Sequence, residues 1–128
     1  MREARHNHGD IVIAEQPLPE PGVDQARVRI VTAGVCHSDL HIVRGDWSGM
    51  NREGPIGHEA IGVVDALGPG AEAFVSVGDR VILGLGGMGG GYWCGACDNC
   101  LRGSPQQCTH SQGIMGTFAE YLVTFAKG

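Results

Sequence analysis

The sequence is poor in aromatic residues, in basic charge and in long apolar runs. Phe, Trp and Tyr supply only 5% of the 128 residues. No run of about 18 apolar residues occurs, so we expect no transmembrane helix and no membrane partner. Acidic side chains outnumber basic ones by 14 to 9, which argues against a nucleic-acid partner. Residues 1–10 lack the apolar segment of a signal peptide, so we expect a cytoplasmic protein.

Helical periodicity is also scarce, and we detect no internal repeat. The only helix we predict spans residues 38–43, with Ser38 as its N-cap and Gly45 as its stop. Glycine is abundant, with 22 residues, and three prolines follow the first apolar run, so turns should separate short strands. The sequence therefore predicts a single, mainly β domain over residues 1–128, built as a small barrel or sandwich. The expected strands are residues 11–14, 26–33, 60–67, 81–83 and 121–125.

One glycine run imitates a nucleotide-binding motif. Residues 84–89 satisfy G-x-G-x-x-G after a predicted strand. The dinucleotide fingerprint also needs a following helix and an acidic residue about 20 positions later to hold the ribose. The sequence supplies neither, since no Asp or Glu lies between Asp98 and Glu120. We therefore interpret the run as a loop that leads into a cysteine cluster.

Four of the five cysteines follow the pattern C-x2-C-x2-C-x7-C. Four thiolates complete a closed tetrahedral zinc shell, which would hold together a loop that has few hydrophobic residues. An iron–sulfur cluster, a nucleic-acid-binding zinc module, and free or disulfide-linked thiols are the alternatives. The spacing of the cysteines differs from that of ferredoxins, which argues against an iron–sulfur cluster. The two charges between Cys94 and His110 sum to zero, which argues against a zinc module that binds nucleic-acid phosphates. We call residues 94–108 the cysteine lobe; its four cysteines are Cys94, Cys97, Cys100 and Cys108.

A second group of chemically active residues lies in the first half of the chain. Residues 36–41 read Cys-His-Ser-Asp-Leu-His, and residues 57–59 read Gly-His-Glu. Taken singly, a cysteine or histidine is usually a core or solvated residue. Together, Cys36 and His58 can supply sulfur and nitrogen to an open zinc site.

These two segments and the cysteine lobe occur in an order that resembles the GroES-like catalytic domain of the zinc-dependent medium-chain alcohol dehydrogenases. Residues 116–121, Gly-Thr-Phe-Ala-Glu-Tyr, resemble the strand that follows the lobe in that family. The resemblance implies a GroES-like small β-barrel with a structural-zinc lobe and little helix. It covers nearly the whole chain but roughly the first third of a full family member, so a further zinc ligand and the Rossmann domain are expected outside it.

Residue by residue, the resemblance implies two zinc sites. Cys36 and His58 would bind the catalytic zinc, Glu59 would be an adjacent or alternate ligand, and Asp39 would orient His58. The cysteine lobe would bind the structural zinc.

The resemblance also implies positions for substrate and cofactor. Ser38 would contact the alcohol oxygen and pass its proton toward His41. His37 would meet the pyrophosphate of NAD(P), and Trp47 would line the pocket of a small alcohol or carbonyl substrate.

Two functions are therefore open. The chain is either the catalytic-domain portion of an NAD(P)-dependent alcohol dehydrogenase, expected to be inactive alone, or a non-enzymatic, zinc-stabilised β module that self-assembles or binds a partner. The resemblance implies that some strands lack the partners that a full family member would supply. Such open strand edges predict a homo-oligomer.

Overall fold

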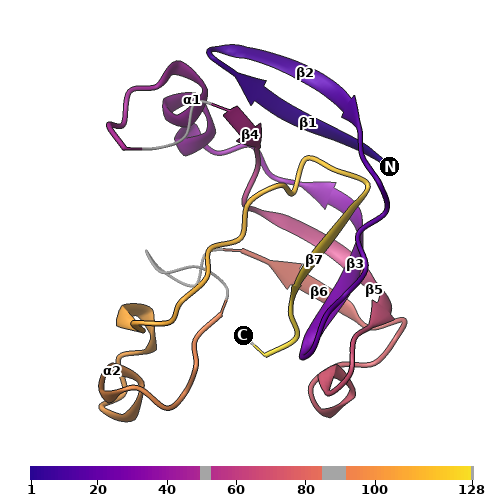
Figure 1. The fold of residues 1–128 in the computed structure, drawn as a ribbon, viewed down its shortest axis with the longest axis vertical. Coiled ribbons are helices and arrows are strands. Elements are labelled where there is room, and N and C mark those ends of the chain that lie inside the picture. The colour runs from indigo at the N-terminus through magenta and orange to yellow at the C-terminus, as the bar shows by residue number, and fades with distance from the viewer. Residues whose placement is uncertain (50–52, 85–91, 128) are drawn as a thin grey trace.

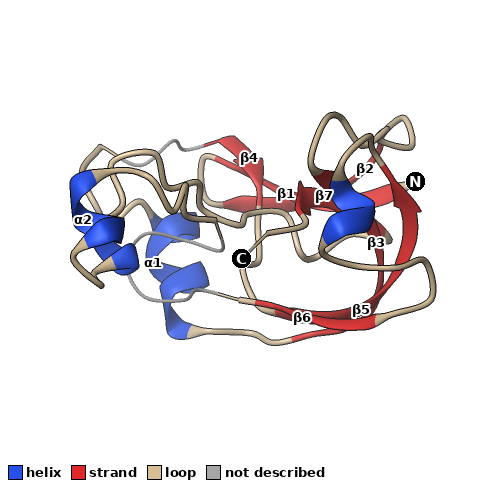
Figure 2. Ribbon diagram, turned by 90° about the horizontal axis from the view of Figure 1, so that it is seen from below, coloured by secondary structure: helices blue, strands red, loops and turns tan. Residues whose placement is uncertain are grey.

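The computed structural model describes residues 1–49, 53–84 and 92–127. Its strands form two antiparallel sheets, a three-stranded sheet of order β2-β1-β4 and a four-stranded sheet of order β6-β5-β3-β7 (Figures 1 and 2). The strands are β1 (Arg2–Asn7), β2 (Asp10–Glu15), β3 (Gln25–Ala33), β4 (Glu53–Pro55), β5 (Ala60–Leu67), β6 (Arg80–Leu83) and β7 (Tyr121–Phe125). The helices are α1 (His37–Arg44), α2 (Asp98–Leu101) and the 3₁₀ turns η1 (Ala71–Ala73) and η2 (Pro105–Gln107).

The mainly β prediction and all five expected strands are confirmed, but β1 and β4 were missed. β1 has no β-branched residue and reads as a polar segment. It becomes a strand because a two-residue turn folds it back onto β2. The turn residues His8 and Gly9 both have positive φ, at 49° and 106°, as the turn of a tight hairpin requires.

Helix α1 corrects the predicted N-cap. Ser38 is not the cap, because the helix begins one residue earlier at His37, and Cys36 holds the extended backbone of a capping position. The Asp39 carboxylate accepts the backbone N–H of Cys36 at 2.9 Å, which satisfies one of the free donors at this end. The predicted stop is confirmed, since Gly45 closes the helix at φ 73°. The helix α2 and both 3₁₀ turns were missed because they are too short to show helical periodicity.

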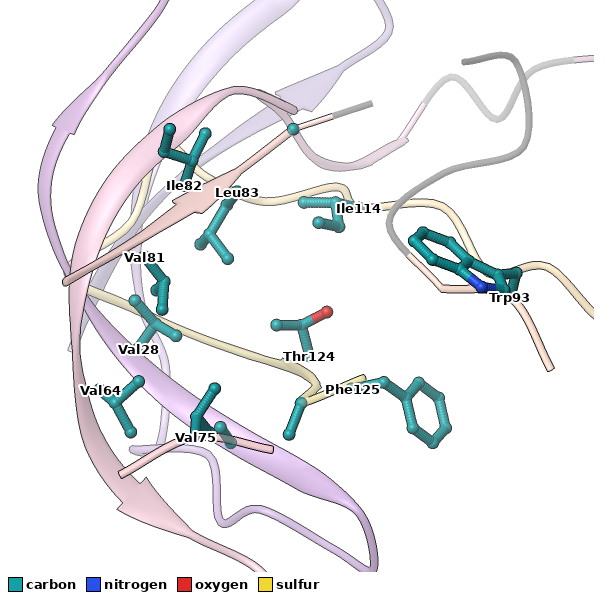
Figure 3. Close-up of a pocket in the computed structure, with 13 residues that line it drawn as sticks. Val28, Val64, Val75, Val81, Ile82, Leu83, Trp93, Ile114, Thr124 and Phe125 are labelled. Carbon is teal, nitrogen blue, oxygen red and sulfur yellow. The ribbon is translucent and has the colours of Figure 1, made fainter. Parts of the chain in front are cut away.

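The main core lies on the inner face of the four-stranded sheet. Val28 and Val64 are almost fully buried, and Val28 forms the core cluster with Ala60, Leu83 and Ile114. A cavity of about 460 Å³ remains between this face and the base of the cysteine lobe. Figure 3 shows Trp93 and Ile114 on the lobe side of this cavity, across from the valines of the sheet.

Residues 116–120 join the two sheets. The N–H of Ala4 in β1 donates to the carbonyl of Phe118, and Glu120 binds Arg2 through backbone and side-chain atoms. Most of the glycine run, residues 85–89, lies outside the described residues, so its interpretation as a loop stays a prediction. In the described part of the chain, no helix has the length and apolar character needed to cross a membrane.

Candidate metal centres

Cys36, His58 and Glu59 come together at one end of the four-stranded sheet. β3 and β5 are antiparallel neighbours in which Ala33 pairs with Ala60. The chain that leaves β3 and the chain that enters β5 therefore meet at the same end of the sheet. Cys36 lies three residues after the end of β3, and Glu59 lies one residue before the start of β5. One ligand atom from each of the three side chains lies within 4.8 Å of the others. Sulfur, nitrogen and oxygen donors at this separation fit a zinc ion with an open coordination position.

Asp39 holds two members of this group in place. Its Oδ1 lies 3.0 Å from Nδ1 of His58, and its Oδ2 accepts the backbone N–H of Cys36 at 2.9 Å. Both Asp39 and His58 are buried. A carboxylate on Nδ1 leaves Nε2 as the nitrogen that faces the cluster, and Nε2 lies 3.7 Å from Oε1 of Glu59.

The electrostatics of the group favour the charged cysteine. The pKa of the Cys36 thiol is lowered, first by the backbone N–H of Ser38, then by the Ser38 hydroxyl and by His58. Burial alone would lower the pKa of His58. Hydrogen bonding to Cys36 and the negative charge of Asp39 outweigh burial, so the pKa of His58 is raised. A metal ion binds the thiolate together with the neutral imidazole, so it would displace the proton that the raised pKa of His58 retains.

The residues expected to meet substrate and cofactor lie along α1. The Ser38 hydroxyl is 3.6 Å from the Cys36 sulfur. His41 packs edge-on against His37 with ring centroids 5.0 Å apart and stacks on Trp47 at 5.2 Å. The Nδ1 atom of His41 lies 2.8 Å from a carboxylate oxygen of Asp46, a partner that the sequence analysis missed.

The cysteine lobe brings its four sulfur atoms to one point. The distances are 3.5 Å from Cys97 to Cys100, 3.6 Å from Cys94 to Cys108 and 3.9 Å from Cys97 to Cys108. A tetrahedral zinc ion with bonds of about 2.3 Å sets its sulfur ligands about 3.8 Å apart. The four cysteines therefore fit a closed zinc shell. Cys100 lies in α2, Cys97 is the N-cap of α2 and Cys108 follows η2. A bridge between Tyr92 and Gln112 closes the base of the lobe.

Backbone N–H groups prepare part of this shell for negative charge. Hydrogen bonds from Cys100 and Thr109 lower the pKa of Cys97 to about 5, and those from Ala96 and Cys97 lower the pKa of Cys94 to about 7. Burial and the neighbouring thiol of Cys97 raise the pKa of Cys100 to about 12. Four thiolates this close repel one another, and a divalent cation offsets that repulsion.

The apolar cavity between the four-stranded sheet and the cysteine lobe is separate from both groups. None of the expected site residues lines the 460 Å³ cavity. A shallower hollow of about 490 Å³ includes Glu59 and continues over Ile61 and Ile82. Glu59 of the Cys36 group thus borders this second hollow.

A family model for the alcohol dehydrogenase GroES-like domain matches residues 22–128. The chain belongs to this family. The GroES-like, mainly β fold and the resemblance seen in the sequence are thereby confirmed.

The chain is similar in sequence to several dehydrogenases. The chain is 39% identical to an L-threonine 3-dehydrogenase from Anaeromyxobacter sp., with 94% of this chain and 36% of the relative covered. It is 37% identical to an alcohol dehydrogenase from Schizosaccharomyces pombe, with 94% and 35% covered. A crystal structure of an Escherichia coli alcohol dehydrogenase complexed with NADH matches with a TM-score of 0.81 and 34% identity, over 98% of this chain and 36% of that one. The GroES-like domain described here thus spans about a third of these relatives' length.

Proposed function

We propose that this GroES-like domain is the zinc-binding catalytic portion of an NAD(P)-dependent alcohol dehydrogenase that oxidises a small alcohol to its carbonyl in the cytoplasm. The proposal depends on one observation, the convergence of Cys36, His58 and Glu59 within 4.8 Å around a His58 ring fixed by Asp39. Family membership and the named dehydrogenase relatives support it.

The residues around this group have distinct roles in the proposal. Cys36 and His58 would hold a zinc ion, which would supply Lewis-acid chemistry that lowers the pKa of the alcohol, and a nicotinamide cofactor would accept the hydride. The Ser38 hydroxyl, beside the Cys36 sulfur, accepts the alcohol proton and gives up its own hydroxyl proton. His41 is held by Asp46 and stacked on Trp47, and it receives the proton that Ser38 gives up. His37 contacts the cofactor pyrophosphate, and Trp47 lines the substrate pocket.

The number of metal ions per chain tests this assignment. We expect two zinc ions per chain in native mass spectra, one in the cysteine lobe and one at Cys36 and His58. The His58→Asn variant should retain only the lobe zinc, because it loses the imidazole ligand. Cobalt substituted at the site should give a thiolate-to-cobalt absorption band that disappears in Cys36→Ser. Equal metal counts in the unchanged chain and in His58→Asn would contradict the proposed site.

A second candidate function, self-assembly, is favoured by the edge strand β2. In the described part of the chain β2 pairs only with β1, and Ile11, Val12 and Ile13 are all exposed on it. An unprotected apolar edge favours pairing with another chain. We propose that a second copy pairs there.

Light scattering tests this assembly. We expect a mass of at least twice the 13.4 kDa of one chain. Ile13→Lys should return the protein to a monomer, because a charged side chain on an edge strand disfavours pairing. Val23→Lys is the matched control, since Val23 is 68% exposed and Ile13 is 69% exposed, but Val23 lies outside any strand. A monomeric mass for the unchanged protein at high concentration would contradict the proposed self-assembly.

A further inference from the structure

One backbone carbonyl connects the two segments that carry the proposed catalytic ligands. The carbonyl oxygen of Glu59, the residue after His58, accepts the N–H of Gly34 at 2.9 Å. Gly34 lies two residues before Cys36. The same oxygen accepts the hydroxyl of Thr117 at 3.3 Å. Three distant parts of the chain therefore meet at this carbonyl, next to the group formed by Cys36, His58 and Glu59.

The segment around Thr117 packs directly against the turn that carries His58. The carbonyl of Gly57 accepts the N–H groups of Gly116 at 2.8 Å and Thr117 at 3.2 Å. Gly57 has φ 88°, and a Cβ atom there would lie 2.6 Å from the Thr117 hydroxyl oxygen. Glycine is thus required at 57 both for the backbone conformation and for the approach of Thr117.

Thr117 is completely buried, and its hydroxyl has one described partner, the Glu59 carbonyl. A buried hydroxyl without a partner is costly, so this hydrogen bond fixes both the Thr117 rotamer and the Glu59 peptide. Asp39 sets the rotation of the His58 ring from one side. The Thr117 hydroxyl holds the backbone of the same turn through the Glu59 carbonyl.

We propose that Thr117 is a positioning residue for the metal site: its hydroxyl holds the turn that carries His58 and Glu59 at the distance from Cys36 that metal binding needs. Thr117 contacts no proposed ligand atom, and it acts through the Glu59 carbonyl. The inference rests on the proposed function of the Cys36 site and extends it to the segment that follows the cysteine lobe.

Cobalt binding to the chain that carries zinc only in the cysteine lobe tests the role of the hydroxyl. Thr117→Val keeps the shape of threonine and removes the hydroxyl, so we expect about tenfold weaker cobalt binding at Cys36 and His58, the lower range for partners that orient metal ligands. The ligand-field bands of the bound cobalt should also shift, because the donors are less well placed. The zinc content of the cysteine lobe should not change.

A second pair of variants separates the hydroxyl from packing. Thr117→Ser and Thr117→Ala lack the same methyl group and differ only by the hydroxyl. We expect Thr117→Ser to bind cobalt within about threefold of the unchanged chain and Thr117→Ala to bind about tenfold more weakly. This pair also serves if Thr117→Val does not fold.

The outcomes distinguish this inference from the function on which it rests. If the unchanged chain binds cobalt at Cys36 and His58 but Thr117→Val and Thr117→Ala bind it equally well, the positioning role is wrong and the proposed metal site stands. If the unchanged chain binds no cobalt there, the proposed metal site itself fails, and Thr117 has nothing to position.

Discussion

The Cys97→Ser variant is expected to bind one zinc ion fewer per chain than the unchanged protein and to lose the ordered structure of the cysteine lobe. The lobe has almost no apolar core, and Leu101, its one large aliphatic residue, is 73% exposed. Its helices α2 and η2 have four and three residues, which is too short for independent stability. Structural zinc supplies on the order of 10 kcal/mol in small zinc-binding peptides. Removing a ligand should therefore unfold the lobe.

Native mass spectrometry and limited proteolysis measure these two effects. Cleavage between Cys94 and Cys108 should be at least about tenfold faster in Cys97→Ser, because local unfolding exposes the backbone. Far-UV circular dichroism should show that the sheets persist, since their core lies around Val28 and Val64. Cys36→Ser is the matched control, because it makes the same chemical change outside the lobe and should leave lobe cleavage unchanged. An unaltered zinc count in Cys97→Ser would rule out a four-cysteine shell.

The sequence predicted the parts of the fold that follow from local patterns. β3 was predicted because small or apolar residues alternate with charged ones along it. β5 was predicted as a strand that ends at the turn of residues 68–70, and both form where expected. β1 could not be predicted in this way. Its residues Arg2–Asn7 carry no strand signal, and it forms because the turn at His8 and Gly9 places it beside β2.

The candidate site shows the same division between local and long-range information. The motif around Cys36 and the motif around His58 were visible in the sequence, and the structure brings their side chains together. Asp46 was not identified, and Thr117 was noted only as part of the segment 116–121, because no local pattern gives either residue a role at the site. Thr117 reaches the Glu59 carbonyl across 58 positions. Only the fold creates that contact.

The cysteine lobe and the proposed catalytic group are linked by the chain that runs between them. Residues 109–116 lead from Cys108 to the segment that binds Gly57 and Glu59. Along this path Ile114 is buried in the main core. A folded lobe therefore fixes the start of a segment whose end lies against the turn of His58. This connection links the order of the closed lobe to the position of the proposed metal site.

Gly68→Ala should destabilise the domain by more than about 3 kcal/mol, which is a large part of the total stability of a small domain. A Cβ atom on Gly68 would lie 1.7 Å from the carbonyl oxygen of Gly22 and 2.9 Å from that of Pro21. Both are backbone atoms, so no side-chain rotation relieves the overlap. Gly68 also donates its N–H to the carbonyl of Gln25 at 2.8 Å, so the end of β5 cannot move without disturbing the start of β3.

Urea unfolding followed by circular dichroism measures this loss of stability. Gly113→Ala is the matched control, because a Cβ atom there meets no heavy atom within 4 Å and its φ is not in the positive range. Its free energy of unfolding should change by less than about 1 kcal/mol, since the substitution mainly reduces the entropy of the unfolded chain. The glycine-rich sequence predicts only that turns separate the strands, and a turn alone predicts a small effect for Gly68→Ala. Equal urea midpoints for the two variants would show that the turn at Gly68 tolerates a side chain. The end of β5 would then not pack as closely against the chain entering β3 as the 1.7 Å between a Gly68 Cβ atom and the Gly22 carbonyl oxygen implies.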